Sequence, residues 1–440
     1  MTDATAETGS PPVKGWNFAR RIGFRFVFCY FALYVCLCRL MEEDLGLETG
    51  FGLAPGGKFV GAAYAKVWAP CVAWTGHHIL HIGKPLAYVP DGNSDGIYGY
   101  VQLVSFAMLA VIATVVWTVW DRKATEYKRL NEWMRVVLRY ALAFSLLNYG
   151  MVKVIPVQFP APRLIDLLRT HGDFTPFWLF WTFMGYSTAY TIFAGAAEVL
   201  AGVLLLFRRT TTLGALAAVA VMLNVVMLDF CYQVPEKLDV IFLFLMTVIL
   251  LAPDFGRLAN LLVLNRATSP VEGPGPLTLR WMRVASAGAK VAIIAYMVFT
   301  SVMLPLNLKA VYSPNSPLFG IYDVEEFSRN GQVTPPLSTD STRWKKVVFL
   351  TTDETWIQKM DDSWDTCDTA YDLAAKNMTV AFNSGQKEGK SVLAYAQQDR
   401  DHMTLSGPLG GDSLSAKLKR IDDSKFKLVR ARFRWINGFP

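Results

Sequence analysis

The chain has 440 residues, enough for two or more structural units, of which 52% are hydrophobic, and its formal net charge is +7. This charge does not indicate nucleic-acid binding, because residues 312–440 carry 17 basic and 17 acidic side chains and the excess lies in short loops beside apolar runs. The six cysteines include no Cys-x-x-Cys motif, so a thioredoxin-like or zinc-ribbon protein has no support.

Residues 1–22 are polar and then basic, and we expect them to be disordered and cytoplasmic. The apolar run that follows is too long for a signal-peptide core and lacks a cleavage site of small residues, so it predicts a retained membrane helix. A helix needs about 20 mostly apolar residues to cross the hydrocarbon layer of a bilayer. Seven runs are predicted to do so: Gly23–Met41, Tyr98–Trp120, Trp133–Met151, Ser187–Phe207, Thr211–Phe230, Leu238–Ala252 and Val284–Leu304.

The stretch 64–82 is apolar and aromatic but contains Lys66 and Pro70, and we interpret it as an interfacial or re-entrant helix, with a true span as the alternative. It ends in three histidines: His77, His78 and His81. Helix spacing places His81 on one face with each of the others, which suits a metal or haem contact. A third ligand would have to come from Asp91, Asp95, His171 or Cys231. The alternative is a belt of amphipathic side chains at the membrane surface.

Basic residues cluster in the N-terminal stretch and in the segments 121–135, 208–209 and 254–283. With seven spans all four segments fall on one side of the membrane, which the positive-inside rule makes the cytoplasmic side. We therefore expect a bacterial inner-membrane protein with a six-span bundle over 23–268, a cytoplasmic linker over 269–283 and a last span over 284–305. Residues 312–440 are then an outer, soluble domain.

That outer domain is predicted to be rich in β-structure. Short stretches such as Leu414–Leu418 and Phe426–Leu428 alternate apolar and polar residues, which is typical of strands with one buried face. Gly407–Ser413 and Asn383–Gly389 read as hairpin connections. We expect an antiparallel barrel or sandwich of six to eight strands that the segment 433–439 closes, with either a filled core or a lipid-binding pocket.

Glu198 lies near the middle of the fourth predicted span, where an ionisable side chain normally faces the bundle interior and has a partner. Helix spacing places it on one face with Gly195 and Gly202, and such small residues let a neighbouring helix approach closely. The candidate partners are Lys153 and Asn224. The resulting site is either a proton or ligand site or a structural pair that holds the bundle together.

Further polar side chains are expected where the outer loops meet, and these are Lys153, Gln158, Asp229, Tyr232, Glu236, Lys237 and Asp239. Tyr149, one helical turn before Lys153, completes the candidate functional residues. Asp229 and Asp239 lie near the ends of the fifth and sixth spans, and carboxylates at such positions can bind cations or relay protons. The alternative is that they are solvated span ends.

Three motifs occur in a characteristic order: Tyr149-Gly150-x-x-Lys153, Gly195-x-x-Glu198-x-x-x-Gly202, and Asp229-Phe230-Cys231-Tyr232-Gln233-Val234-Pro235-x-Lys237-Leu238. This order resembles bacterial DoxX-family membrane proteins, in a subgroup with extra N-terminal spans and a C-terminal domain. The resemblance implies a membrane bundle, and the named DoxX relatives are membrane subunits linked to quinone-dependent sulfur oxidation and to cofactor maturation. The chain lacks a quinone or thiol motif of those redox members.

The leading hypothesis is an accessory or binding membrane protein that couples an outer β domain to a lipid, quinone or protein partner. One alternative is a membrane subunit of a quinone-linked oxidoreductase, in which Glu198 and Lys153 handle protons and a haem or other cofactor lies at the histidines. A small-molecule transporter is the other, although repeated broken helices are absent from the pattern. No phosphate loop, G-x-S-x-G or H-E-x-x-H motif favours another enzyme class.

Overall fold

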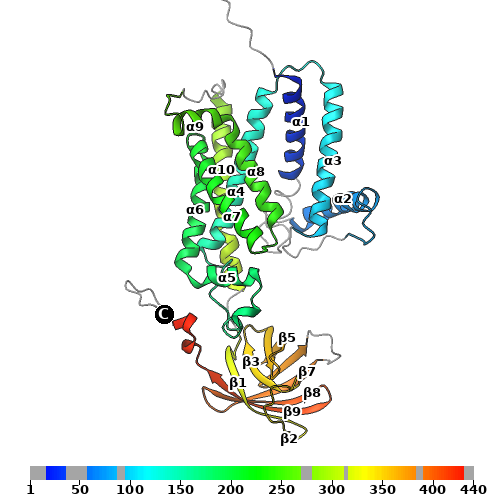
Figure 1. Ribbon diagram of the computed structural model, residues 1–440, viewed down its shortest axis with the longest axis vertical. Coiled ribbons are helices and arrows are strands. Elements are labelled where there is room, and N and C mark those ends of the chain that lie inside the picture. The colour runs from blue at the N-terminus through cyan, green and yellow to red at the C-terminus, as the bar shows by residue number, and fades with distance from the viewer. Residues whose placement is uncertain are drawn as a thin grey trace, which may run out of the picture. The chain divides into compact units, whose positions relative to one another are not determined.

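The computed structural model describes residues 16–35, 57–86, 95–268, 280–311, 316–382 and 390–430. The chain forms two compact units: a helical unit of residues 1–158 and 189–307, and a β unit of residues 159–188 and 308–440 (Figure 1). This division differs from the expected one, because residues 159–188 group with the strands although they lie between two helices of the helical unit.

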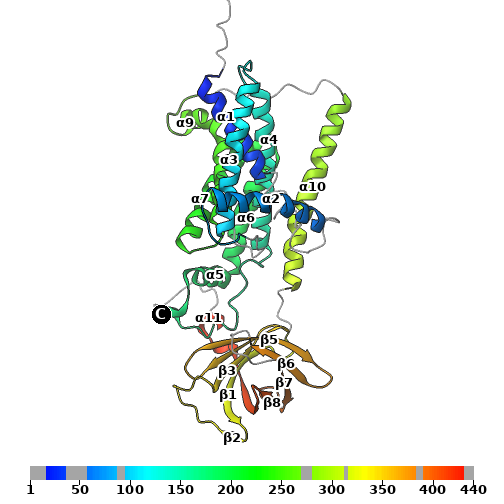
Figure 2. The ribbon, with the colours of Figure 1, turned by 90° about the vertical axis from the view of Figure 1, so that its right-hand side faces the viewer.

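The helical unit contains helices of very different orientation. In chain order they are α1 (Phe18–Leu33), α2 (Gly57–His78), α3 (Ile97–Trp120), α4 (Lys128–Val154), α6 (Thr188–Leu206), α7 (Thr211–Cys231), α8 (Lys237–Leu251), α9 (Phe255–Leu262) and α10 (Arg280–Val311). In Figures 1 and 2 the helices α1, α3, α4, α6, α7 and α8 run along one another, whereas α2 lies across them.

Five helical segments are long and apolar enough to cross a bilayer, and they are Ile97–Trp120, Thr188–Leu206, Arg208–Cys231, Lys237–Leu262 and Arg283–Lys309. Their apolar side chains are not all covered by protein: Ile112 and Val116 of α3, for example, are about half exposed. Apolar helix surface of this kind marks contact with lipid, so the helical unit is of the membrane-inserted type. The predicted count of about seven spans is not confirmed.

The runs predicted at Gly23–Met41 and Trp133–Met151 are not among these five segments. The helix α1 is described over Phe18–Leu33, and the end of the predicted run, residues 36–41, lies outside the described residues. The helix α4 carries Arg135, Arg139 and Lys153, and every residue from Ala141 to Asn148 is buried. Where protein covers a helix on all sides, as over Ala141–Asn148, the helix has no lipid-facing surface there. Its hydrophobicity then says little about whether it crosses the bilayer.

The basic segments meet at one end of the helical unit. Buried Arg25 of α1 donates to the Thr118 hydroxyl of α3 at 2.8 Å. From the first half of α4, Arg139 donates to the Thr211 hydroxyl at 3.3 Å, and Arg135 donates to the Leu250 carbonyl at 3.3 Å. These contacts join the beginnings of α1, α4 and α7 to the ends of α3 and α8, as the charge pattern indicates. The compartment that this end faces stays a prediction.

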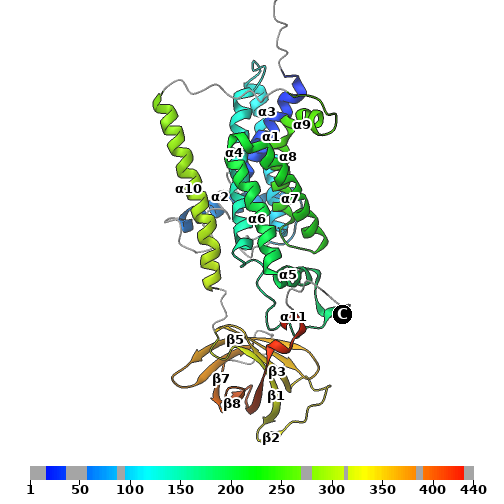
Figure 3. The ribbon, with the colours of Figure 1, turned by 90° about the vertical axis from the view of Figure 1, so that its left-hand side faces the viewer.

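The β unit is an antiparallel barrel (Figure 3). Its strands are β1 (Gly320–Arg329), β2 (Gln332–Val333), β3 (Trp344–Phe349), β4 (Glu354–Lys359), β5 (Trp364–Asp372), β6 (Asn377–Phe382), β7 (Ser391–Gln397), β8 (His402–Leu409) and β9 (Asp412–Ile421). Neighbouring strands pair in the order of the chain, and β1 also pairs with β9 in a register that runs from Ile321 opposite Ile421 to Arg329 opposite Leu414. This pairing closes β1 and β3–β9 into eight strands, and short β2 only extends β1.

Of the two predicted architectures, an antiparallel barrel or a sandwich, the barrel is the one observed. The β8–β9 hairpin turns within Gly407–Ser413, where Gly410 and Gly411 take φ values of 59° and 94° that favour glycine. The strand predicted at Phe426–Leu428 is wrong, because Lys427–Arg430 forms the short helix α11. The hairpin segment 383–389 and the predicted closing segment 433–439 lie outside the described residues, although β6 and β7 do pair.

Large apolar side chains fill the barrel interior, as in the filled-core expectation. The buried cluster includes Phe327, Trp344, Phe349, Leu393, Met403 and Leu405. The Tyr371 hydroxyl lies 3.1 Å from the Ser316 hydroxyl inside the same unit, and burial raises the pKa of Tyr371. The structure therefore gives no support to the alternative of a lipid-binding pocket.

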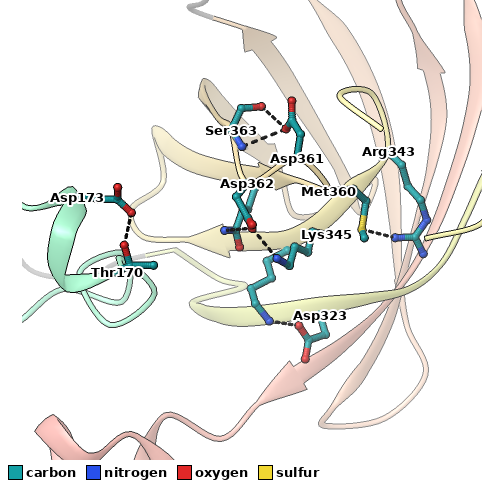
Figure 4. A network of polar contacts seen from close by, with 11 residues as sticks. Thr170, Asp173, Asp323, Arg343, Lys345, Met360, Asp361, Asp362 and Ser363 are labelled. Atoms are coloured by element: carbon teal, nitrogen blue, oxygen red, sulfur yellow. Dashed lines mark hydrogen bonds and ion pairs between the residues drawn. The ribbon is translucent and has the colours of Figure 1, made fainter. Parts of the chain in front are cut away.

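Polar contacts hold the outer turns of the barrel (Figure 4). Lys345 Nζ lies 2.5 Å from the Asp362 carboxylate, and the Ser363 hydroxyl donates to Asp361 at 2.6 Å, which lowers the pKa of Asp361. Arg343 is buried and donates to the carbonyls of Thr334 and Trp344 at 3.0 and 3.1 Å. These bonds fix the ends of β3 and β4 rather than form a site, since each donor meets a local acceptor.

Candidate functional site

The candidate site begins with a buried ion pair between α4 and α6. Lys153 Nζ donates to Glu198 Oε2 at 3.0 Å, and the two residues are 8% and 3% exposed. Lys153 Nζ also lies 3.1 Å from the Tyr149 carbonyl, one helical turn earlier. Of the two partners predicted for Glu198, Lys153 is the one observed, and Asn224 is exposed on α7.

Glycines allow the two helix backbones to touch beside this ion pair. A Cβ atom on Gly195 would lie 2.5 Å from the Gly150 carbonyl oxygen and 2.6 Å from Lys153 Cβ. A Cβ atom on Gly202 would lie 3.1 Å from the Ala143 carbonyl oxygen, further along α6. The predicted close approach on the Glu198 face is therefore confirmed, and the short distance between helices is what lets Lys153 reach Glu198.

Two more polar pairs join helix ends in the helical unit. Lys237 at the start of α8 lies 2.9 Å from the Asp95 carboxylate, whose other oxygen accepts from the Leu238 N–H at 3.0 Å. The Tyr34 hydroxyl donates to Asp239 at 3.3 Å and ties the end of α1 to α8. Asp95 thus satisfies a free N–H of α8 and neutralises Lys237 at the same time.

Asp229 connects these pairs electrostatically. It is 5% exposed near the end of α7 and interacts over a distance with Lys153 and Lys237, and also with Glu236 and Asp95. Acidic side chains outnumber the lysines in this group. Carboxylates at this depth need a cation or a proton for neutralisation, which is why such clusters are candidate functional sites in membrane proteins.

Two further predicted residues are Tyr149 and Gln158. The Tyr149 ring lies 5.8 Å from Lys153 Nζ, within reach of a cation–π contact. The Gln158 side-chain oxygen is buried and makes no hydrogen bond within the described part of the chain. A buried acceptor of this kind is a position that a water molecule or a ligand can satisfy.

The three histidines gather no third metal ligand within the described part of the chain, which does not include the candidate Asp91. His77, His78 and His81 are exposed, and the described residues contain no group of three or more His, Cys, Asp or Glu side chains that could hold a metal ion. His78 instead stacks on Trp74 with ring centroids 5.2 Å apart. Because α2 lies across the long helices (Figure 2), the surface-belt interpretation fits these residues better than a metal or haem site.

Sequence reasoning missed how residues 159–188 pack against the barrel. We call this segment the insert; it contains a short turn of helix, η2 (His171–Asp173), and the helix α5 (Pro176–Tyr186). Leu164 and Ile165 of the insert are buried together with three barrel residues: Ile321, Val348 and Leu350. One sequence signal was the set of apolar residues at 164–168, which Asp166 interrupts and which is too short for a span.

The barrel residues in this contact point outward from the barrel. Ile321 alternates with Tyr322, and Val348 lies between Val347 and Phe349, and these three neighbours belong to the interior core. The outer face of β1 and β3 is therefore apolar where the insert covers it. A barrel strand that is apolar on both faces requires such a cover, and this chain supplies it from a segment between two helices.

The chain thus defines a class of protein: a helical membrane unit joined to an eight-stranded barrel, with one interhelical segment built into the barrel unit. We call the meeting point of α4 and α6, at Gly150, Lys153, Gly195 and Glu198, the root of the insert, since the insert leaves after α4 and returns at α6. The ion pair and the glycine contact join the two helices at this root.

The chain belongs to the family of the Bacillus subtilis (strain 168) protein YwoB, which is described as an uncharacterized protein. The two sequences are 33% identical over 136 residues, which make up 29% of this chain and 80% of YwoB. No family model matches the chain, and no solved structure matches it. Because YwoB is described as uncharacterized, the relation to it indicates no activity for this chain. The DoxX resemblance stays a prediction.

Proposed function

We propose that this is a non-catalytic accessory or binding protein of the bacterial inner membrane, of DoxX type, whose helical unit anchors the barrel so that the barrel unit binds a lipid, quinone or protein partner. The observation that carries the proposal is the packing of the insert on the barrel through Leu164 and Ile165. A barrel that was only tethered to the helical unit would need a single chain connection, the one that follows α10. This one is also attached through a segment that lies between two helices of the helical unit, of which α6 is long and apolar enough to cross a bilayer.

The root of the insert gives this attachment a defined geometry. Full burial of Leu164 and Ile165 contributes roughly 1.5–3 kcal/mol for each side chain. At the root, the Lys153–Glu198 pair fixes the distance between the helices that carry the two ends of the insert. The insert therefore connects the barrel unit to two helix ends that are held together at the root.

Replacement of Ile165 by aspartate is expected to release the insert without unfolding the barrel. Ile165 is 1% exposed, and a carboxylate in its place would be buried beside Val348 and Leu350 without a cation. The barrel interior is a separate cluster and should persist. Hydrogen exchange measured by mass spectrometry should rise in peptides covering 159–175 and stay unchanged in β5 and β6.

The matched control is Leu373→Asp, which changes an exposed apolar residue of the same unit and should leave exchange in the insert as it is in the parent. Mass spectrometry of molecules that co-purify with the parent and with Ile165→Asp then tests the function. We expect a lipid, quinone or protein that the variant retains less well. Equal exchange in 159–175 for both chains would refute the attachment.

The proposed orientation places the basic end of the helical unit in the cytoplasm and the barrel outside. We expect Leu373→Cys to react with a membrane-impermeant thiol reagent in intact spheroplasts, because this position is 64% exposed on the barrel. Thr125→Cys, exposed in the basic loop after α3, should react only after lysis. The measurement uses chains whose native cysteines are replaced by alanine, and the reverse pattern would place the barrel inside.

A quinone-linked redox subunit is the second candidate, and the buried acidic group around Asp229 favours it. In that function Glu198, Lys153 and Asp229 would move protons near a quinone headgroup. A haem or quinone absorbance band in stoichiometric amount in the purified protein would favour this candidate over the accessory function. A colourless sample without either would count against it.

A further inference from the structure

The helix α5 presents an aromatic face that neither the barrel attachment nor the root explains. It has 11 residues, six of them aromatic, and begins with the Thr175 hydroxyl accepting from the Trp178 N–H at 3.3 Å. Leu179, Phe183 and Tyr186 follow one another at helical spacing and are 38%, 61% and 46% exposed. Three large apolar side chains on one exposed face form a patch of the kind that contacts a partner or a membrane.

The opposite face of α5 is firmly packed, so the exposed patch has a fixed place on the helix. The Phe159 ring lies 5.6 Å from the Phe180 ring and 4.7 Å from the Trp181 ring. Phe180 and Met184 are buried, and Gly185 sits against the Pro160 carbonyl so closely that a Cβ atom would not fit. Rotation of α5 to hide Phe183 would break these contacts.

The position of α5 in the chain identifies what covers this patch. Only Ser187 separates the end of α5 from the start of α6, a helix long and apolar enough to cross a bilayer. Two peptide links reach at most about 7 Å. The headgroup region on each side of the hydrocarbon core is roughly 5–8 Å thick. The exposed face of α5 therefore begins within a headgroup thickness of the start of α6.

The neighbouring side chains have the chemistry of that region. In the first turns of α6, Tyr190 and Phe193 are 48% and 69% exposed, so large aromatic side chains lie on the surface of this helix as well. The Trp178 ring of α5 lies 4.5 and 5.7 Å from the guanidinium groups of Arg163 and Arg169 in the preceding part of the insert, where Arg163 also pairs with Asp166 at 3.2 Å. Aromatic rings beside arginines are typical of the membrane interface, where the rings enter the acyl boundary and the cations meet lipid phosphates.

We propose that α5 is an interfacial helix that inserts Leu179, Phe183 and Tyr186 among the phospholipids next to the start of α6. The insert then has a lipid contact of its own in addition to its contact with the barrel. This inference depends on α6 being a span and does not require that the barrel bind any partner.

Photo-crosslinking of the full chain in native membranes tests the proposal. Benzoylphenylalanine replaces Phe183, a conservative change of an exposed ring. The same probe at Phe193 of α6 is the positive control, and at Leu373, which is 64% exposed on the barrel, it is the negative control. After irradiation, intact mass spectrometry should show the mass of one phospholipid added at 183 and at 193, and none at 373.

Two outcomes would overturn the proposal. One is the absence of a lipid adduct at 183 while the 193 probe gives one, which would leave α5 outside the bilayer. The other is an adduct to protein at 183, which would make the aromatic face a protein-binding surface. Because the readout at 183 is lipid itself, failure here leaves the exchange and co-purification tests of the accessory function unaffected.

Discussion

Replacement of Glu198 by alanine is expected to destabilise the helical unit by about 3–5 kcal/mol, because the Lys153 ammonium would remain buried without its counter-charge. The loss should appear as a lower midpoint of thermal aggregation for the protein in detergent, followed by size-exclusion chromatography of the soluble fraction. Lys153→Ala should have an effect of similar size, since it leaves Glu198 buried and alone.

The double variant Lys153→Met with Glu198→Met is the decisive control. It removes both charges and keeps the volume, and exchange of a whole buried ion pair for apolar side chains is often neutral or stabilising. We expect it to recover most of the stability that Glu198→Ala loses. If Glu198→Ala were as stable as the parent, the ion pair would not hold the root of the insert together.

The variant Glu198→Gln distinguishes a functional role of Glu198 from a purely structural role. The amide keeps the shape of the side chain and still accepts from Lys153. If the Glu198→Gln protein accumulates normally but loses its co-purifying partner, Glu198 has a function beyond structure. Loss of the variant protein from the membrane would assign Glu198 a structural role only.

Gly195→Ala is expected to be the most disruptive single-methyl change in the helical unit. Its Cβ atom would lie 2.5 Å from the Gly150 carbonyl oxygen, and helix backbone on both sides prevents local relief. The helices α4 and α6 must then move apart, which stretches the Lys153–Glu198 hydrogen bond. Overpacking of this kind costs about 1–3 kcal/mol, and the weakened ion pair adds to it. The midpoint of thermal aggregation measures the sum.

The matched control is Gly288→Ala in α10, where a Cβ atom meets nothing within 4 Å. Alanine should be neutral there or stabilise the helix by roughly 0.5–1 kcal/mol, since glycine has a lower helix propensity. Equal midpoints for the two variants would show that α4 and α6 do not touch at Gly195.

The contact at the root could be predicted from the sequence because its residues are unusual within a membrane-type helix. Glu198 is a charge in the middle of an apolar run, and glycines flank it at spacings of three and four. Tyr34 and Asp95 gave no comparable signal, since a tyrosine in an apolar run and an aspartate in a loop are ordinary. Their contacts with Asp239 and Lys237 depend on how helix ends meet in space.

The helix α4 and the insert show where local patterns fail. Hydrophobicity predicted a span at Trp133–Met151, but the burial of Ala141–Asn148 on all sides of α4 follows from the neighbouring helices rather than from the composition of α4 itself. The insert was assigned to the membrane bundle because of its place in the chain. Its partner surface on the barrel consists of residues such as Ile321 and Val348, whose outward direction is known only once the barrel register is fixed.

The contact between Ile165 and the barrel also imposes an order on biosynthesis. The ribosome releases Leu164 and Ile165 before α6–α10 are translated, and the surface that covers them exists only after β1 and β3 have emerged. The barrel itself closes when β9, the last strand of the described residues, pairs with β1. Residues made in the first half of translation therefore reach their native surroundings last, and they stay exposed to chaperones and proteases in the interval.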